Sequence, residues 1–245
     1  LLAMSFYADS DGDGAYDDLM DRYIVAWPLV DGGSLEPHGL VARYSFEGGV
    51  ANDDAPEPLG RAIDAGLFGG AAVAAGGVSG DALWLSGNQD YAEAGAIDDY
   101  VLSLNDDLTL SLWVRLDSLS SGTWANTLIA YGTNDYYTED EETNYSYWLN
   151  LQQAFDGTYL HFYWEHSNGN NVSVYPSTPM SLSLDTWHHI VATRDASTME
   201  ARFYLNGAPV GGAVPFANLP TSGGRGMLYL GSDTADLVGV GYEIS

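Results

Sequence analysis

Apolar and polar residues alternate in short runs along most of the chain after residue 40, and clusters of Gly, Asn, Asp and Pro separate these runs. Alternation with a period of two is typical of half-buried β-strands, and the separating residues favour turns. Helical periodicity is nearly absent beyond residue 24. Many short antiparallel strands favour an all-β sandwich or barrel. The predicted strands are residues 40–46, 82–86, 108–116, 126–131, 145–152, 158–165, 171–175, 187–194, 200–205 and 226–230.

Two consecutive predicted strands, 145–152 and 158–165, each have one apolar face and one mixed face. Because successive side chains on a strand point to opposite faces, we expect the apolar set in the core. We expect Trp113 and Trp187 there as well. The apolar set of the two strands is Tyr147, Leu149, Leu151, Leu160, Phe162 and Trp164.

The mixed face of these two strands combines aromatic rings with polar groups. Aromatic rings pack on the apolar C–H faces of sugars while polar side chains bind sugar hydroxyls, so this face is a candidate ligand-binding platform. The alternative interpretation is that neighbouring strands or loops cover it as a second small core. The residues concerned are Trp148, Asn150, Gln152, His161, Tyr163 and Glu165.

Charge changes this picture of a plain sandwich. The chain has 245 residues, a formal net charge of −27 and no cysteine. Such a chain repels nucleic acid and anionic membrane surfaces and attracts divalent cations. No apolar run approaches the about 20 residues that cross a bilayer, so we expect no membrane insertion and no nucleic-acid partner.

The stretch YADSDGDGAYDDLMDRY, residues 7–23, places aspartates at the spacing of an EF-hand calcium loop, with a glycine at the turn. Calcium prefers six to eight oxygen ligands, which these residues can supply. Met20 stands where the bidentate glutamate would be, so the pattern is incomplete, and a solvated acidic turn is the alternative. The predicted Ca²⁺ ligands are Asp9, Asp11, Asp13, Ala15 through its carbonyl, Asp17, Asp18 and Asp21.

Six segments occur in an order that resembles a known family: LVARYSFEGGVANDD, ALWLSGNQDYAE, LTLSLWVRLDS, DTWHHIVATRD, ARFYLNGAPVGG and MLYLGSD. Over residues 40–235 the chain resembles the laminin-G-like, concanavalin A-like jelly-roll domains of secreted proteins. The resemblance implies two antiparallel sheets packed face to face, a structural role for His189, and binding of a glycan or an extracellular protein. The aspartate-rich stretch resembles the calcium repeats of thrombospondin type 3.

Two further loops are candidate sites. Asn52 and Asp53 follow the first strand of the expected sandwich, where the resembling family often contributes to a calcium at the rim; a plain turn is the alternative. The acidic segment 134–144 contains Tyr136 and Tyr137, which could frame a binding edge, although a charge run is most simply a solvated loop.

The final strand of the resembling family is not found before the sequence stops at GVGYEIS. That strand would lie beside residues 40–46, and an open slot there would leave unpaired backbone groups. We expect the sequence to be a fragment of a longer chain; the alternative is that another segment, or another copy, fills the slot.

We therefore divide the chain into a calcium-binding loop at 1–23, a linker at 24–39 and a sandwich at 40–245. The expected function is a calcium-stabilised, non-catalytic carbohydrate-binding or adhesive module of a secreted or cell-surface protein. A self-assembling structural protein with strand complementation between copies is the alternative. A glycan-cleaving enzyme is less favoured, because hydrolysis needs two facing carboxylates and the mixed face supplies only Glu165.

Overall fold

The computed structural model describes residues 2–3, 40–55, 62–86, 90–95, 102, 104–119, 126–132, 145–166, 170–220 and 226–232. Its elements are almost entirely strands, joined by one short 3₁₀ helix, η1 (Glu47–Gly49). The strands are β1 (Leu2–Ala3), β2 (Ala65–Phe68), β3 (Ala72–Gly77), β4 (Gly80–Trp84), β5 (Tyr91–Ala94), β6 (Leu108–Arg115), β7 (Thr127–Gly132), β8 (Tyr147–Ala154), β9 (Gly157–His166), β10 (Asn170–Val174), β11 (Trp187–Asp195), β12 (Glu200–Leu205), β13 (Ala208–Pro209), β14 (Val214–Pro215) and β15 (Met227–Leu230).

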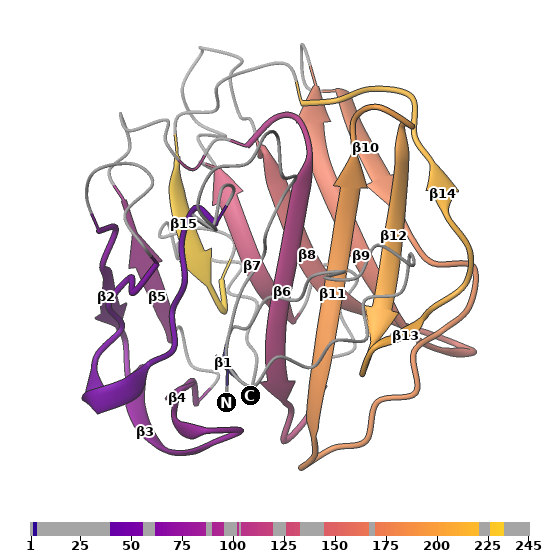
Figure 1. The fold of residues 1–245 in the computed structure, drawn as a ribbon. Helices are drawn as coiled ribbons and strands as arrows, with labels where there is room; N and C mark the ends of the chain where they lie inside the picture. The colour runs from indigo at the N-terminus through magenta and orange to yellow at the C-terminus, as the bar shows by residue number, and fades with distance from the viewer. Residues whose placement is uncertain are drawn as a thin grey trace, which may run out of the picture.

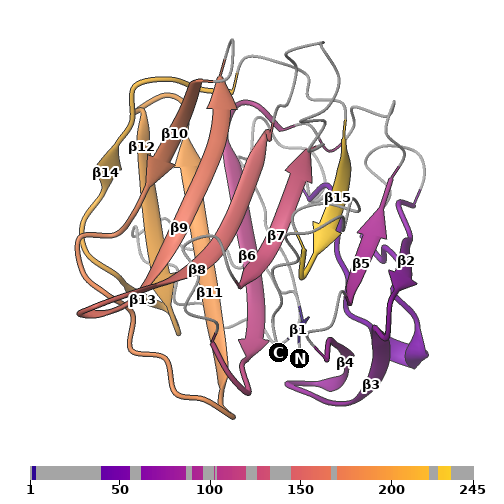
Figure 2. The same cartoon turned by 180° about the vertical axis from the view of Figure 1, so that it is seen from behind.

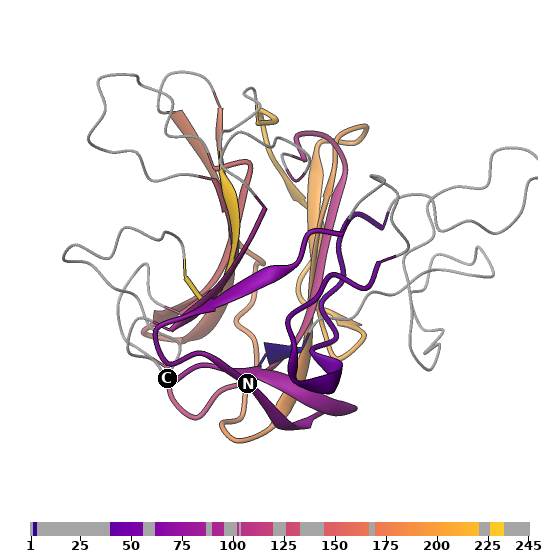
Figure 3. The same cartoon turned by 90° about the vertical axis from the view of Figure 1, so that its left-hand side faces the viewer.

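These strands form two antiparallel sheets packed face to face (Figure 1). The eight-stranded sheet has the order β13-β12-β11-β6-β1-β4-β3, with β14 also pairing β12. The seven-stranded sheet has the order β10-β9-β8-β7-β15-β5-β2 and faces the viewer in Figure 2. In the side view the seven-stranded sheet bends so that its outer surface is concave (Figure 3). The all-β jelly-roll sandwich predicted from the sequence is confirmed.

The strands predicted from residue 82 onward are confirmed to within a few residues, but others were missed. Strands β2, β3 and β5 have the sequences AGLF, AVAAGG and YAEA. Alanine and glycine have low strand propensity, so these strands are set by pairing with their neighbours rather than by local preference. Asn206 and Gly207 form the two-residue turn between β12 and β13, and both have the positive φ that a type I′ hairpin requires.

The prediction of a strand at residues 40–46 is wrong. The backbone of Arg43 bonds to the loop that follows instead of to a sheet: its N–H donates to the Asp53 carboxylate and its carbonyl accepts from Asp54 N–H. The segment still contributes Tyr44 and Phe46 to the core, where both are almost fully buried. Its hydrophobic pattern therefore predicted the burial correctly and the strand incorrectly.

The core lies between the two sheets and consists of alternate residues of their strands. The six residues assigned to it on β8 and β9, from Tyr147 to Trp164, are all buried there. From the opposite sheet, Leu110, Leu112 and Ile190 meet them. At about 25 cal/mol per Å² of apolar surface, this burial is the main contribution to the stability of the sandwich.

A buried arginine crosses the space between the sheets. Arg194 of β11 donates hydrogen bonds to the backbone carbonyls of Asp106 and Ser146, each at 3.0 Å, and of Leu104. Its guanidinium lies 5.0 Å from the ring centre of Trp164 on the other sheet. Burial lowers the pKa of Arg194 to about 10. The carbonyls and the ring replace the water that this cation loses.

The two tryptophans expected in the core are not there. Trp113 and Trp187 are half-buried on the outer surface of the eight-stranded sheet, because the core-facing positions of β6 and β11 have the opposite parity. His189 shares that outer surface; it is buried and lies 2.8 Å from Ser111 Oγ through Nε2. Its neighbour His188 lies on the opposite surface of β11, because successive side chains of a strand alternate between its two faces.

The two described residues of β1 pair with strands on both sides. Leu2 is opposite Leu83 of β4 and Val114 of β6, and Ala3 is opposite Trp113. A segment of this chain therefore lies between β4 and β6 in the eight-stranded sheet. Whether the sequence is a fragment of a longer chain stays a prediction. Nowhere in the described ranges is there a helix of the length and apolarity needed to cross a membrane.

Candidate functional site

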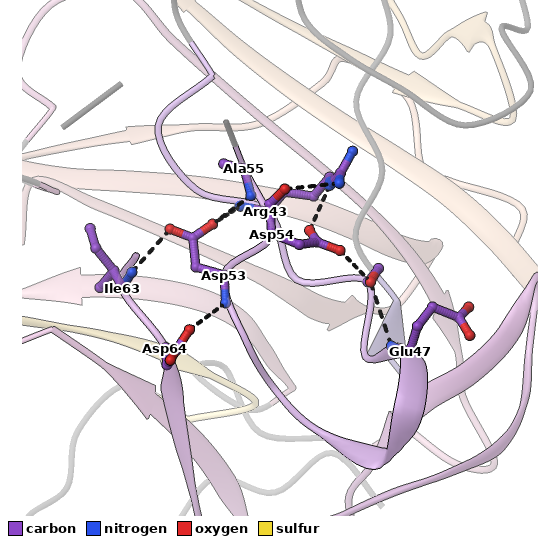
Figure 4. Close-up of polar contacts among 8 residues, drawn as sticks. Arg43, Glu47, Asp53, Asp54, Ala55, Ile63 and Asp64 are labelled. Atoms are coloured by element: carbon purple, nitrogen blue, oxygen red, sulfur yellow. Dashed lines mark hydrogen bonds and ion pairs between the residues drawn. The ribbon is translucent and has the colours of Figure 1, made fainter. Parts of the chain in front are cut away.

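Asp53 forms a compact hydrogen-bonding centre beneath the loop that follows residue 50 (Figure 4). Its Oδ1 accepts from the N–H groups of Arg43 at 2.9 Å and Ala55 at 3.0 Å, and its Oδ2 accepts from Ile63 N–H at 3.1 Å. Its own N–H donates to Asp64 Oδ1 at 3.0 Å. We call this set the Asp53 centre. It joins three chain segments through one carboxylate.

The same loop was a predicted calcium site, with Asn52 and Asp53 as ligands. The three hydrogen bonds from backbone N–H groups use three of the four lone pairs of the Asp53 carboxylate, so one lone pair, on Oδ2, is left for a metal ion. Asn52 is exposed, and Asp54 is paired with Arg43 at 2.6 Å. Within the described residues no three His, Cys, Asp or Glu side chains are grouped to hold a metal. The second calcium stays a prediction.

The other predicted site residues gather on the outer surface of the seven-stranded sheet, which we call the seven-strand face. Cross-strand pairing brings Trp148 opposite Tyr163 and Asn150 opposite His161. The face is built by β7, β8, β9 and β10, so that residues from segments far apart in sequence become neighbours. The six residues that the alternation placed together are Trp148, Asn150, Gln152, His161, Tyr163 and Glu165.

One part of this face is an aromatic cluster. Trp148 lies 5.2 Å from Tyr145 and 5.6 Å from Tyr163 between ring centres, and Ala130 of β7 completes the group. The indole N–H donates to Thr127 Oγ1 at 3.0 Å. The three rings are each less than a tenth exposed. This part of the face is therefore a second small core, which was the alternative to a ligand-binding platform in the sequence analysis.

Beside the cluster is a polar network around His161. Its Nε2 lies 3.2 Å from Ser173 Oγ, and its Nδ1 lies 3.2 Å from Asn150 Oδ1 and 3.0 Å from Gln152 Nε2. The imidazole stacks on Tyr175, with ring centres 4.4 Å apart and planes 8° from parallel. Burial lowers the pKa of His161 to about 4, so the ring is neutral at physiological pH.

The network has more hydrogen-bonding capacity than it uses. Nδ1 of a neutral imidazole carries either one proton or one lone pair, so it can serve only one of the two amides, Asn150 or Gln152. Asn150 is fully buried, and no acceptor for its Nδ2 is found in the part of the chain that the structure describes. A buried donor without a partner costs about 1–3 kcal/mol, so this arrangement makes the folded protein less stable than one with an apolar or fully hydrogen-bonded side chain here.

A partly buried carboxylate lies on the same face. Glu165 accepts from the Tyr163 hydroxyl at 2.7 Å through Oε1, while its buried Oε2 makes no hydrogen bond of normal geometry within the described residues. Burial raises the pKa of Glu165, although its contact with the Tyr145 backbone opposes this, and burial together with Glu165 raises the pKa of Tyr163. Among the described residues the face thus contains one buried donor without an acceptor, Asn150 Nδ2, which can bind the oxygen of a hydroxyl group.

Two residues of the network, Ser173 and Tyr175, were missed in the sequence. The strand at 171–175 was predicted, and its alternation places Val172 and Val174 on one side and these two on the other. The signal was therefore present, but the contact with His161 depends on the pairing of β10 with β9.

The remaining predicted site residues lie outside the described part of the chain. They are Asp9, Asp11, Asp13, Ala15, Asp17, Asp18, Asp21, Tyr136 and Tyr137. The aspartate-rich calcium loop and the binding edge at Tyr136 and Tyr137 stay predictions.

The sandwich, with binding groups on the outer surface of one sheet, is a lectin-type architecture. The chain belongs to the concanavalin A-like lectin/glucanases superfamily, whose laminin-G-type sequence model matches residues 86–240. This confirms the resemblance that the ordered segments indicated. No curated protein matches the sequence.

Similar solved structures include domain 4 of AbnA, a GH43 extracellular arabinanase from Geobacillus stearothermophilus, in complex with arabinotriose. It is 20% identical with a TM-score of 0.48, and the match covers 71% of this chain and 75% of that one. Domains LG4-5 of the mouse laminin alpha1 chain are 16% identical with a TM-score of 0.38, over 58% of this chain and 33% of that one. The Ruminococcus gnavus IT-sialidase CBM40 bound to alpha2,3 sialyllactose is 12% identical with a TM-score of 0.42, over 59% and 73%.

Proposed function

We propose that this protein is a non-catalytic carbohydrate-binding or adhesive module that recognises a glycan on the seven-strand face. The observation that carries the proposal is the polar network, in which the His161–Tyr175 stack adjoins the unpartnered amide of Asn150. Membership of a lectin/glucanase superfamily supports the same class of ligand.

The groups of the network suit the two sides of a sugar ring. The ring of Tyr175 is only half-buried and can present its outer π-face to the apolar C–H groups, while the fully buried His161 supports it by stacking on the other face. Gln152, Ser173 and the amide of Asn150 can bind hydroxyls. A concave surface with aromatic walls and a few placed polar groups is the usual form of a small-ligand site.

The described carboxylates of this face do not form a hydrolytic pair. Glu93 projects from β5 and Glu165 from β9, and these strands are four positions apart in the sheet order. At about 4.8 Å per strand they are separated by about 19 Å, whereas glycosidases need about 5–9.5 Å. This spacing supports binding rather than cleavage.

We also propose that calcium stabilises the aspartate-rich stretch from Asp9 to Asp21, because its oxygen ligands have the spacing of a calcium loop. Its role is structural and separate from recognition. The proposed module is secreted or at the cell surface, since the domains that the chain resembles are mostly extracellular.

A glycan array tests the proposal. The native protein is applied with calcium and with chelator, alongside an Asn150→Ala variant and an Arg202→Ala control that removes an exposed polar side chain from the other sheet. We expect the native protein and the control to bind the same glycans and Asn150→Ala to lose about tenfold or more in affinity, the value of one lost buried hydrogen bond.

Two results would overturn the proposal. One is no binding to any glycan by a protein that is folded by circular dichroism. The other is undiminished binding by Asn150→Ala. Light scattering on the same samples tests the alternative of self-assembly through exchanged strands, which predicts a stable oligomer in place of a monomer.

A further inference from the structure

One lateral side of the sandwich is formed by the last strands of both sheets. Strand β2 ends the seven-stranded sheet, β3 ends the eight-stranded sheet, and residues 69–71 join them directly. Both strands lie on the side that faces the viewer in Figure 3. Among the described strands each of the two pairs with a single neighbour, so a row of its backbone N–H and C=O groups points away from the sheet.

The opposite side of the sandwich has the features that protect strand edges. Strands β13 and β14 are two residues long, and each ends in a proline, Pro209 or Pro215. Strand β10 exposes Asn170 and Asn171 and is soon followed by Pro176. Short strands, prolines and polar side chains hinder an edge from pairing with another chain.

The side formed by β2 and β3 lacks this protection. Residues 65–80 contain no proline and no charged side chain, in a chain whose formal net charge is −27. A β-bulge interrupts the pairing of β3 only near its end, between Ala75 and Gly77, so residues 72–75 pair regularly with β4. The edge of β3 is therefore extended, uncharged and lined by small side chains that let another backbone approach.

Exposed apolar side chains surround this edge. Of the six large hydrophobic residues that the described part of the chain exposes, four are Val50, Phe68, Val78 and Trp84. Phe68 ends β2, Val78 is in the turn between β3 and β4, and Trp84 ends β4. Val50 follows η1, which packs against β3 and β4. A group of exposed apolar residues of this kind marks an interaction site.

The charge of the chain indicates the partner. A basic partner would be attracted by most of this acidic surface and would not need an uncharged contact, whereas a partner of the same sign is repelled everywhere except at such a contact. A second copy of the chain is a partner of the same sign. Its own β3, placed antiparallel, also supplies complementary backbone groups across a two-fold axis, the commonest symmetry of dimers.

We infer that two copies of this chain associate edge to edge through β3, so that their eight-stranded sheets become one continuous antiparallel sheet. Opposite residues of paired strands share a face. Val73 packs against the core and Ala74 is exposed, so the two cannot lie opposite each other, and the two-fold axis passes through one of them.

The dimer goes beyond the proposed function of a single module. Its two-fold axis is normal to the joined sheet, so both seven-strand faces point to the same side. Two binding faces held in this way can engage one surface together, which raises avidity without any new contact to the ligand.

Sedimentation velocity over a range of protein concentrations tests the interface. The samples are the native protein, Ala74→Lys and Asn171→Lys, each checked for folding by circular dichroism. Both variants place a lysine at an exposed position of an edge strand and change the charge equally, but Asn171 is on β10 at the opposite side.

We expect a native dimer that dissociates on dilution. Raising NaCl from about 0.05 M to about 0.5 M should strengthen it, because salt screens the repulsion between the copies. Ala74→Lys should raise the dissociation constant about tenfold or more, since a lysine at the edge opposes pairing, while Asn171→Lys changes it less than about twofold.

The absence of cysteine from the sequence permits a second measurement by disulfide cross-linking. On mild oxidation Ala74→Cys should form a linked dimer if the axis passes through Ala74. A mixture of Ala72→Cys and Ala74→Cys should form one if it passes through Val73, because those two positions then lie opposite each other. Asn171→Cys should stay unlinked.

Three results would overturn the interface: a monomer at every concentration and salt, equal dissociation constants for the two lysine variants, or no cross-link in either cysteine sample. A dimer that survives both dilution and Ala74→Lys would indicate exchanged strands instead. Glycan binding by Ala74→Lys separates this inference from the proposed function, because a monomeric variant that still binds its glycan retains the single module.

Discussion

The Asp53 centre and the polar network around Asn150 are two buried polar groups that the same sandwich treats in opposite ways. Asp53 uses its carboxylate for three backbone N–H groups, so both of its oxygens are hydrogen-bonded. Asn150 is more deeply buried, yet its Nδ2 has no acceptor among the described residues. A satisfied buried group is explained by architecture, whereas an unsatisfied one carries a cost that stability alone does not explain.

This difference separates the two kinds of site in the molecule. The Asp53 centre replaces backbone pairing where residues 40–46 form no strand, and it belongs to the fold. The polar network costs stability in the unliganded protein, which fits a surface that reaches full satisfaction only with a ligand. Each prediction below changes one side of this comparison and leaves the other as its reference.

The largest effect is expected at the Asp53 centre. Asp53→Asn keeps the shape but replaces one carboxylate oxygen by an N–H₂ group facing a backbone N–H, and it removes the charge from the remaining bonds. We expect a loss of about 4 kcal/mol in the free energy of unfolding, measured in urea, since hydrogen bonds to a charged group contribute about 1.5–3 kcal/mol each. Asp54→Asn, at an exposed ion pair, should cost less than about 1 kcal/mol. Equal losses in the two variants would remove the distinction.

The next effect concerns the proton balance of the polar network. Burial lowers the pKa of His161 from 6.5 to about 4, so between these values the unfolded chain binds a proton that the folded chain does not. Stability is therefore complete above pH 6.5 and falls as the pH drops to about 4, by up to about 3 kcal/mol. His161→Gln removes this contribution, while Glu165 and the other acids contribute equally to both proteins. Urea unfolding at several pH values between 6.5 and 4 should show that the native protein loses up to about 3 kcal/mol more in the free energy of unfolding than His161→Gln does. Equal losses in the two proteins would contradict this role of His161.

The two sites also differ in how far the sequence predicts them. Alternation is local, and it correctly assigned Tyr147 to the core and Asn150 to the outer surface of the same strand. It failed for Trp113, because an aromatic residue on a strand indicates a strand but not which sheet surface is buried. The leucines of β6 occupy alternate positions and face the core, which leaves Trp113 on the outer surface.

What the sequence could not supply was the order of the strands. The stack of Tyr175 on His161 depends on the pairing of β10 with β9, and the stack of Phe68 on Tyr91 depends on the pairing of β2 with β5. These pairings join segments that are far apart in the chain. The sequence therefore predicted the central part of the candidate face and missed its far edge.

A smaller effect of opposite sign is expected when the unpartnered amide is removed. Asn150→Leu keeps the volume, eliminates the orphaned Nδ2 and loses the contact with His161 Nδ1, which Gln152 can still serve. We expect the unliganded protein to gain about 1 kcal/mol in the free energy of unfolding while glycan binding is lost, because a buried polar group replaced by an apolar one of similar shape can be stabilising. Loss of stability on the scale of Asp53→Asn would instead make Asn150 an architectural residue.

The smallest effect is expected on recognition when calcium is removed. The proposed ligands from Asp9 to Asp21 are separated in sequence from every residue of the seven-strand face, so chelation should change the affinity for the best-binding oligosaccharide by less than about twofold, within about 0.4 kcal/mol. Calorimetry with CaCl₂ should show binding that the double variant Asp11→Asn, Asp13→Asn abolishes and that Asp156→Asn, an exposed aspartate in the β8–β9 turn, does not. A tenfold fall in glycan affinity on chelation would place the metal in the recognition surface and would contradict the separate, structural role proposed for it.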